Sequence, residues 1–249
     1  ITEILANEQP IDRKKWLSAV FKYFKKCLPS EIKSNSDQLK KLEIIPDQFD
    51  NWHCMSLIKT PLLPMPGQTK ELYQVLTKLN IFLLQGPKEL TDAIHEFKGE
   101  HSDFVWNLTP SHVGNYIKLH VEDSTTLNEA ALDDHQKILY PLLDFLASTD
   151  WLKKNDQRWL LLRKARILPT VCKDRVSAET KGIYMLGGFE PAPEVKGKYR
   201  VLHTKSNDDN WRKLFEALGV SILEGGLFIE EVLLPSFVSA TPEQQLVYL

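Results

Sequence analysis

The sequence lacks the short glycine-rich and nucleophile motifs that many enzymes carry. No GxxxxGK[ST] loop is present, and the glycine pairs at 187–188 and 225–226 do not extend into a GxGxxG loop. A phosphate-binding loop needs several backbone N–H groups that converge at the start of a helix. No GxSxG turn occurs, and the neighbours His53 and Cys54 would point to opposite faces of a strand. We therefore expect neither catalysis nor a nucleotide cofactor.

Cysteine is scarce, and no histidine cluster has the spacing of a metal site. Cys27, Cys54 and Cys172 lie far apart, and there is no CxxC pair. The segments HVED (120–123) and DDH (133–135) place acids beside histidine, but neither contains HExxH. The acids of DDH are expected in the first turn of a helix, where the helix dipole stabilises carboxylates. We expect no metal or other cofactor, and three reduced thiols of a cytoplasmic protein.

Neither an excess of charge nor a long apolar run is present. The 31 Lys and Arg residues balance 33 Asp and Glu residues, which gives a net charge of −2. Such a chain has no general attraction for nucleic acid or anionic membranes. No apolar run approaches the ~18 residues of a membrane span, and no signal-peptide pattern is present. Because the sequence begins at Ile1, we expect it to be a segment of a longer protein.

Apolar spacing predicts helices at 12–28, 126–147 and 208–218. The second range contains Pro141, which removes a backbone donor, so we expect a kink or a break there. Gly219 can take the left-handed conformation that ends the third helix. The apolar stripe of that helix is expected from Trp211, Leu214, Phe215 and Leu218.

Short apolar runs bounded by Pro, Gly or Asn predict short strands. They cover residues 43–45, 56–63, 81–84, 166–168, 183–186 and 201–203. Together with the helices, they predict an α+β fold that is rich in helix and has short strands in small sheets.

Two Leu-Pro segments suggest an internal repeat. LLP (62–64), NIFLLQG (80–86) and TPSHVGNYI (109–117) are echoed in the same order by ILP (167–169), GIYMLGG (182–188) and TPEQQLVYL (241–249). Chance similarity among apolar segments is the alternative. We expect two quasi-repeated units, 1–108 and 109–240, with 241–249 as the start of a following helix. Because Pro cannot donate to a strand ladder, Leu63 and Leu168 are expected as buried strand ends.

Several segments together resemble the repeats of the sacsin family, whose members are very large cytosolic proteins linked to chaperone function. They are TPLLPMPGQTKELYQVLTKLNI (60–81), RKARILPTV (163–171), GGFEPAP (187–193), WRKLFEALGVSI (211–222) and FIEEVLLPSFVSATPEQQL (228–246). In that family each large repeat begins with a heat-shock-type ATPase module, whose nucleotide boxes are missing here. The resemblance therefore implies a region downstream of the ATPase, with no catalytic residues to carry over. It implies protein partners, unfolded clients or neighbouring modules of the same long chain.

The first predicted helix has the strongest excess of one sign of charge in the sequence. Its basic residues, set against the single acid Asp12, are Arg13, Lys14, Lys15, Lys22, Lys25 and Lys26. A basic amphipathic helix can bind acidic partners, membranes or nucleic acid, but more often it presents a solvated face. These six residues are the candidate partner-binding site of a non-catalytic scaffold and interaction module. The alternatives are a nucleotide-dependent enzyme domain and a domain that binds nucleic acid or acidic partners through this helix.

Overall fold

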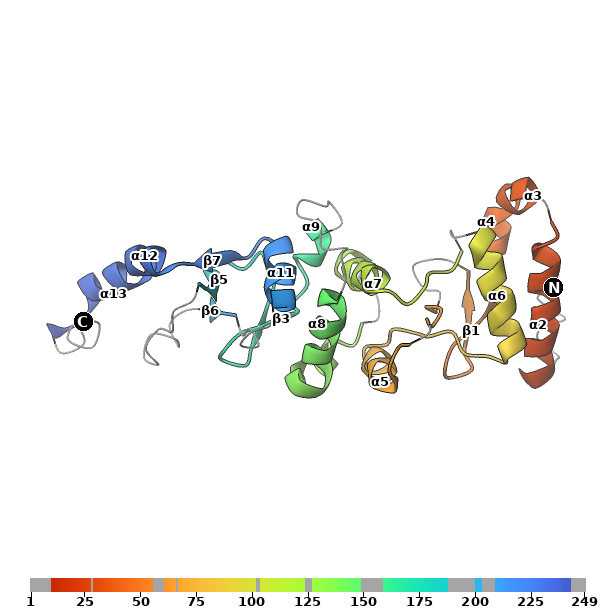
Figure 1. Cartoon of the computed structure of the whole chain (residues 1–249), viewed down its shortest axis with the longest axis horizontal. Helices are drawn as coiled ribbons and strands as arrows, with labels where there is room; N and C mark the ends of the chain where they lie inside the picture. Colours follow the sequence, from red (N-terminus) through yellow and green to blue (C-terminus); the bar gives the residue numbers. More distant parts are fainter. Residues whose placement is uncertain are drawn as a thin grey trace. The chain divides into compact units, whose positions relative to one another are not determined.

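The fold was derived from a computed structural model, in which contacts divide the chain into two compact units. The structure describes residues 10–27, 29–55, 61–65, 67–101, 104–123, 127–148, 159–187, 200–202 and 209–242. Unit 1 is Ile1–Ala131 and unit 2 is Leu132–Leu249. Figure 1 shows the elements of both units along the chain.

Unit 1 contains six described helices and one antiparallel hairpin. These are α2 (Pro10–Phe24), α3 (Pro29–Ser34), α4 (Ser36–Leu39), β1 (Glu43–Pro46), β2 (Trp52–Cys54), α5 (Lys70–Lys78), α6 (Lys88–Glu100) and α7 (Pro110–Asp123). A 3-10 turn, η1 (Glu129–Asp133), lies where the two units divide.

The core of unit 1 forms where α2 packs along α6 (Figure 1). Leu17 and Phe21 of α2 are fully buried, and so are Ile94 and Phe97 of α6. The rings of Phe21 and Phe97 meet edge to face, with centroids 5.5 Å apart. Each side chain of this size stabilises the fold by about 1.5–3 kcal/mol when it leaves water. The helix predicted over 12–28 is present as α2, but it ends earlier than expected, at Phe24, and Leu28 lies outside the described residues.

Unit 2 contains a second hairpin and a three-stranded parallel sheet. Its elements are the π-helical turn η2 (His135–Leu139), α8 (Tyr140–Ala147), α9 (Trp159–Leu162), β3 (Leu168–Pro169), β4 (Arg175–Val176), β5 (Ile183–Leu186), β6 (Arg200–Val201), α11 (Asp209–Ala217), β7 (Ser221–Leu223), α12 (Gly225–Phe228), the π-helical turn η3 (Ile229–Leu233) and α13 (Leu234–Ser239). The sheet has the order β6-β5-β7.

The third predicted helix is confirmed as α11, which packs against α8. Its expected stripe, from Trp211 to Leu218, is fully buried. Within this core the indole Nε1 of Trp211 donates a hydrogen bond of 2.7 Å to Asp144 on α8. Gly219 follows with φ of +84°, in the left-handed region expected for the residue that ends the helix.

The two hairpins close with the same backbone pattern. Pro46 pairs with Trp52 in unit 1, and Pro169 pairs with Arg175 in unit 2. Within each turn the residue after the proline donates its N–H across the loop, at 3.0 Å in unit 1 and 2.9 Å in unit 2. The residue three positions after that one, Asp50 or Lys173, has a positive φ.

Each unit also places one central segment between two parallel neighbours. In unit 1 Leu62 bridges to Leu83 and Leu63 to Asn107. In unit 2 β5 pairs in parallel with β6 and β7. The echoed Leu-Pro segments are therefore not equivalent in position, because Leu63 lies in the parallel arrangement and Leu168 in a hairpin. The quasi-repeated units 1–108 and 109–240 stay a prediction.

The helix-rich α+β fold with short strands in small sheets is confirmed, but some elements differ from expectation. The range 126–147 is not one helix. It is interrupted at Asp134, between η1 and η2. η2 then continues directly into α8, so at Pro141 the structure has a change from π-helical to α-helical pattern in place of the expected break. Of the predicted strand 56–63, residues 56–60 lie outside the described part, and Leu62 and Leu63 form isolated bridges. Both predicted strand-end leucines, Leu63 and Leu168, are fully buried. None of the described helices is long and apolar enough to cross a membrane.

Candidate protein-interaction surface

The basic residues of α2 divide into a group that stabilises unit 1 and a group that faces solvent. The Arg13 guanidinium lies 3.8 Å from the centre of the Trp52 ring and donates to the Glu43 carbonyl oxygen at 3.0 Å. Burial lowers the pKa of Arg13, and the charge of Glu43 partly opposes this shift. Lys14 forms an ion pair with Asp50 in the turn of the hairpin. Arg13 and Lys14 therefore fasten α2 to the β1–β2 hairpin.

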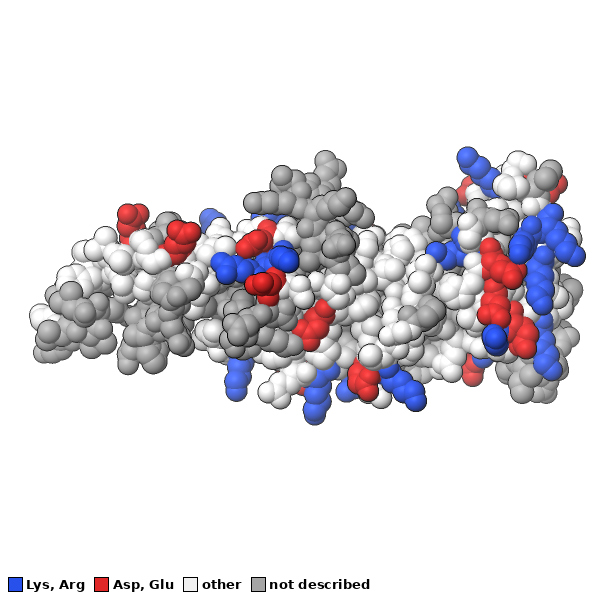
Figure 2. All heavy atoms as spheres, in the orientation of Figure 1, with Lys and Arg blue, Asp and Glu red and all other residues white. Residues whose placement is uncertain are grey.

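Of the other four basic residues, one pairs with α6 and three are exposed. Lys25 forms a 3.0 Å ion pair with Glu96 on α6. Figure 2 shows the blue side chains of α2 running beside the red side chains of α6. Lys15, Lys22 and Lys26 are exposed and form no ion pair within the described ranges. The six candidate residues thus do not form a single binding surface.

An open apolar groove lies where α2 ends and the chain folds back through α3 and α4. We call it the α2–α4 groove, and its volume is about 310 Å³. Its lining residues are Tyr23, Phe24, Cys27, Glu31, Ile32, Asn35, Gln38, Leu39 and Leu42. Most of these side chains are apolar or aromatic, as is usual for a site that binds an apolar group.

The sequence positions this groove through two breaks in helical structure. Pro29 begins α3, where a proline is tolerated because the first helical N–H has no partner within the helix. Asn35 separates α3 from α4, and its side-chain amide donates to the Glu31 carbonyl oxygen at 2.9 Å. The short helices can therefore turn their apolar residues toward α2.

The floor of the α2–α4 groove rests on the core of unit 1, while one edge is exposed. Ile32 and Leu39 are buried, and Phe24 packs against Phe21 and Phe97. By contrast, Tyr23 keeps 65% of its surface exposed. An aromatic side chain held beside an apolar hollow is typical of the anchors in protein interfaces.

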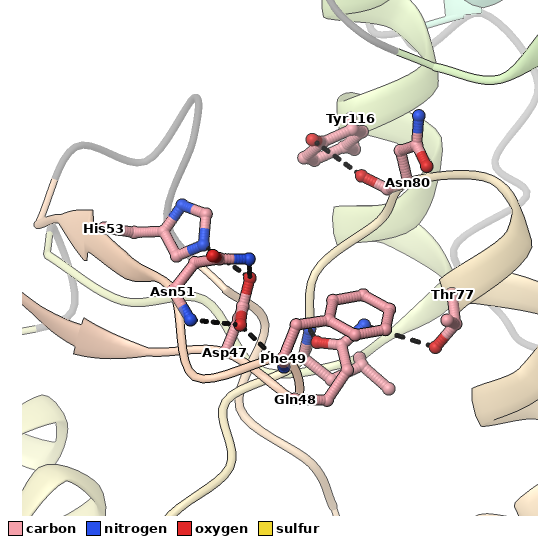
Figure 3. A network of polar contacts seen from close by, with 9 residues as sticks. Asp47, Gln48, Phe49, Asn51, His53, Thr77, Asn80 and Tyr116 are labelled. Carbon is pink, nitrogen blue, oxygen red and sulfur yellow. Dashed lines mark hydrogen bonds and ion pairs between the residues drawn. The ribbon is translucent and has the colours of Figure 1, made fainter. Parts of the chain in front are cut away.

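A buried carboxylate in the hairpin turn, that of Asp47, forms a network of hydrogen bonds (Figure 3). Asp47 Oδ1 accepts from the N–H of Phe49 at 2.7 Å and of Asn51 at 2.9 Å. Its Oδ2 accepts from Asn51 Nδ2 at 3.1 Å and lies 2.8 Å from His53 Nε2. Burial alone would raise the pKa of Asp47, but the hydrogen bonds from His53, Phe49 and Asn51 outweigh it and lower the pKa. All the lone-pair sites of this carboxylate are used to hold the turn.

The same turn is tied to the neighbouring segments by Gln48. Its side-chain amide donates to the Thr77 hydroxyl at 3.2 Å, and its carbonyl oxygen accepts from the Leu83 N–H at 2.7 Å. Nearby, the Tyr116 hydroxyl donates to the Asn80 carbonyl oxygen at 3.3 Å (Figure 3). These contacts connect the hairpin turn to the end of α5 and to the segment after it.

The pKa of His112 is also shifted for a structural reason. The His112 ring stacks on Trp106 with centroids 4.9 Å apart. Its Nδ1 lies 2.7 Å from the Asn107 carbonyl oxygen, which can only accept, so Nδ1 carries the proton. Burial is the main reason that the pKa of His112 is lowered; the bond to Asn107 opposes this, and the charge of Lys98 adds to it. His112 thereby holds the loop that precedes α7.

The acid–histidine segments noted in the sequence also have structural partners. Asp134 caps the η2 turn by accepting from the Lys137 N–H, and Asp133 forms a 2.8 Å ion pair with Arg175. His120 lies 2.9 Å from a carboxylate oxygen of Glu129. Within the described ranges, no group of three or more His, Cys, Asp or Glu side chains could hold a metal ion.

The sequence pointed to the basic residues of the first helix, and the groove beside them was not predicted. A signal was present, because the aromatic residues Tyr23 and Phe24 are followed closely by Pro29, which favours a turn of the chain at this point. No protein-family model, curated protein or solved structure matches the chain. The α2–α4 groove is therefore the candidate site on its geometry alone.

Proposed function

We propose that this chain is a non-catalytic scaffold and interaction module of a very large, cytoplasmic, sacsin-like protein. It contributes a surface for protein partners or unfolded clients. The observation that carries the proposal is the α2–α4 groove, an open apolar hollow edged by the exposed ring of Tyr23. Exposed apolar anchors of this kind bind apolar side chains of other proteins, and this binding needs no catalysed reaction.

The polar groups of unit 1 support the same proposal. The carboxylate of Asp47 has a lowered pKa and accepts four hydrogen bonds from its own hairpin. A general base that works near neutral pH needs a pKa near that pH and an open lone pair. The His112 proton is committed to a backbone carbonyl oxygen. These groups stabilise loops and are poorly suited to proton transfer.

A permanently unfolded client protein, reduced and carboxymethylated, tests the proposal. We expect saturable binding to the 249-residue chain in calorimetric titration. Removing the anchor with Tyr23→Ser should weaken binding about tenfold, since a central aromatic anchor contributes ~1–2 kcal/mol. The matched control is Phe49→Ser, which removes another exposed aromatic ring, 56% exposed, from the hairpin turn. No binding, or equal loss in both variants, would contradict the proposal.

The enzyme alternative is tested on the same preparation. We expect no heat of binding with Mg-ATP and no phosphate release above the buffer control. Saturable ATP binding or release above that control would favour the enzyme alternative.

A further inference from the structure

The proposed function does not say which kind of protein segment binds in the α2–α4 groove. The charged side chains around the groove indicate the charge that such a segment carries. Three of the six basic residues of α2 are already engaged: Arg13 with Trp52 and Glu43, Lys14 with Asp50, and Lys25 with Glu96. Lys15, Lys22 and Lys26 are the exposed basic residues of the set that pair with no carboxylate in the described part of the chain.

Two of these three lysines lie next to the exposed anchor of the groove. Lys22 directly precedes Tyr23, and Lys26 lies in the turn after α2, where its N–H donates to the Tyr23 carbonyl oxygen at 2.8 Å. Lys15 lies two turns earlier on α2 and is remote from Tyr23 along the helix. The aromatic edge of the groove thus has two uncommitted positive charges beside it.

Resting on the proposed function, we propose that the groove binds a protein segment in which apolar anchors are flanked by acidic residues. The anchors occupy the hollow beside Tyr23, and Asp or Glu side chains of the segment pair with Lys22 and Lys26. Glu31 lines the groove as its one acidic residue, so it opposes acidic flanks on its own side. The bound segment therefore carries its acids toward α2.

The arrangement favours a protein segment over RNA. Nucleic-acid surfaces need a continuous row of cations that follows a phosphate backbone. Here that row is interrupted, because Lys25, which precedes Lys26 in the turn after α2, is already paired with Glu96. An apolar hollow next to two lysines is better matched to alternating apolar and acidic side chains.

Three short fluorescent peptides with the same Leu and Phe anchors test the inference. Their flanking residues are Glu, Gln or Lys, and binding is followed by fluorescence anisotropy at low and high salt. We expect the Glu peptide to bind roughly three- to tenfold more tightly than the Gln peptide, as two exposed ion pairs provide. High salt should reduce this difference. The Lys peptide should bind most weakly.

Variants assign the effect to the two lysines. Lys22→Ser with Lys26→Ser should remove the preference for Glu flanks and leave the affinity for the Gln peptide unchanged. The control pair Lys15→Ser with Lys33→Ser removes the same charge from exposed positions outside the lining, and it should keep the preference. Glu31→Gln should strengthen binding of the Glu peptide.

The outcomes separate the inference from the proposed function. Equal affinity for all three peptides would overturn the acidic-segment inference and leave the interaction module intact. Failure of every peptide and of the unfolded client would overturn both. Salt-dependent binding of a single-stranded RNA, lost in the Lys22 and Lys26 variant but not in the control pair, would overturn the inference in favour of a nucleic-acid surface.

Discussion

The guanidinium of Arg13 lies over the ring of Trp52, 3.8 Å from its centre, and joins α2 to the β1–β2 hairpin. Arg13 also donates to the Glu43 carbonyl oxygen on the same hairpin. A residue that the sequence suggests as a partner contact thus has a structural role. Some basic residues of this segment hold unit 1 together and others are exposed to solvent. The candidate binding site is therefore the groove at the C-terminal end of α2.

Arg13→Ala should lower the free energy of unfolding by about 1–2 kcal/mol, because it removes a cation–π contact and a hydrogen bond. Lys15→Ala is the control on the same helix, since Lys15 is exposed. It should change stability by less than about 0.5 kcal/mol. Urea unfolding followed by circular dichroism measures both. Equal effects of the two substitutions would show that the Arg13 contacts add nothing.

Asp47 gives a pH dependence of known sign. Its folded pKa is lowered, so the ionised carboxylate stabilises the fold above the unfolded pKa of about 3.9. This stabilisation is lost as pH falls through the lower folded pKa. We expect the difference in unfolding free energy between wild type and Asp47→Asn to be constant above about pH 5 and to shrink below about pH 4.

The control for this pH series is Asp50→Asn in the same turn. Asp50 pairs with Lys14 but keeps 70% of its side chain exposed, and Asn also tolerates a positive φ. Its effect should stay within about 0.5 kcal/mol. A difference for Asp47→Asn that does not vary with pH would contradict the assignment.

Gly219 combines a positive φ with a close neighbour. A Cβ at this position would lie 3.0 Å from Nη2 of Arg163. Gly219→Ala should therefore cost about 1 kcal/mol or more. Gly67→Ala has the same φ of +84° but open space, so it isolates the backbone cost. Gly226→Ala has neither constraint and should be neutral or stabilising.

Thermal melting of the three glycine variants orders them by cost. A loss for Gly219→Ala no larger than that for Gly67→Ala would show that the Arg163 side chain moves away freely. In that case, making Gly219→Ala in an Arg163→Ala background would not reduce its cost in thermal stability.

Leu168 is fully buried at the end of a strand, and Leu168→Ala should cost about 2–5 kcal/mol through the lost burial and the cavity it leaves. Val171, three residues later, is 37% exposed in the turn of the same hairpin. Val171→Ala should cost less than about 0.5 kcal/mol. Chemical denaturation of the pair checks this, and a cost for Leu168→Ala near that of Val171→Ala would place Leu168 outside the core.

Local patterns predicted the elements whose stabilisation is local. α11 was predicted from an apolar stripe and a terminal glycine. Strand β2 of unit 1 was missed. β2 has three half-buried residues, Trp52–Cys54, without alternation, and it forms because β1 pairs with it.

The site was only partly predictable for a related reason. The sequence shows that Arg13 and Lys25 are charged, but it does not show their partners. Arg13 contacts Trp52, about 40 residues away in sequence, and Lys25 pairs with Glu96, about 70 residues away. The groove likewise forms only when α3 and α4 fold back on α2. The two Leu-Pro segments occupy different positions, since one lies in a hairpin and the other in a parallel bridge, and similar triplets in the sequence do not reveal this difference.

The most direct test of the interaction surface uses the three cysteines as reporters. Cys27 lines the α2–α4 groove, Cys54 lies in β2, and Cys172 is exposed in the β3–β4 turn. Alkylation rates, read by mass spectrometry with and without the reduced, carboxymethylated client at saturation, measure where the client binds. We expect protection of Cys27 alone, with Cys54 and Cys172 unchanged. Unchanged alkylation of Cys27 in the presence of bound client would contradict a partner surface at the groove.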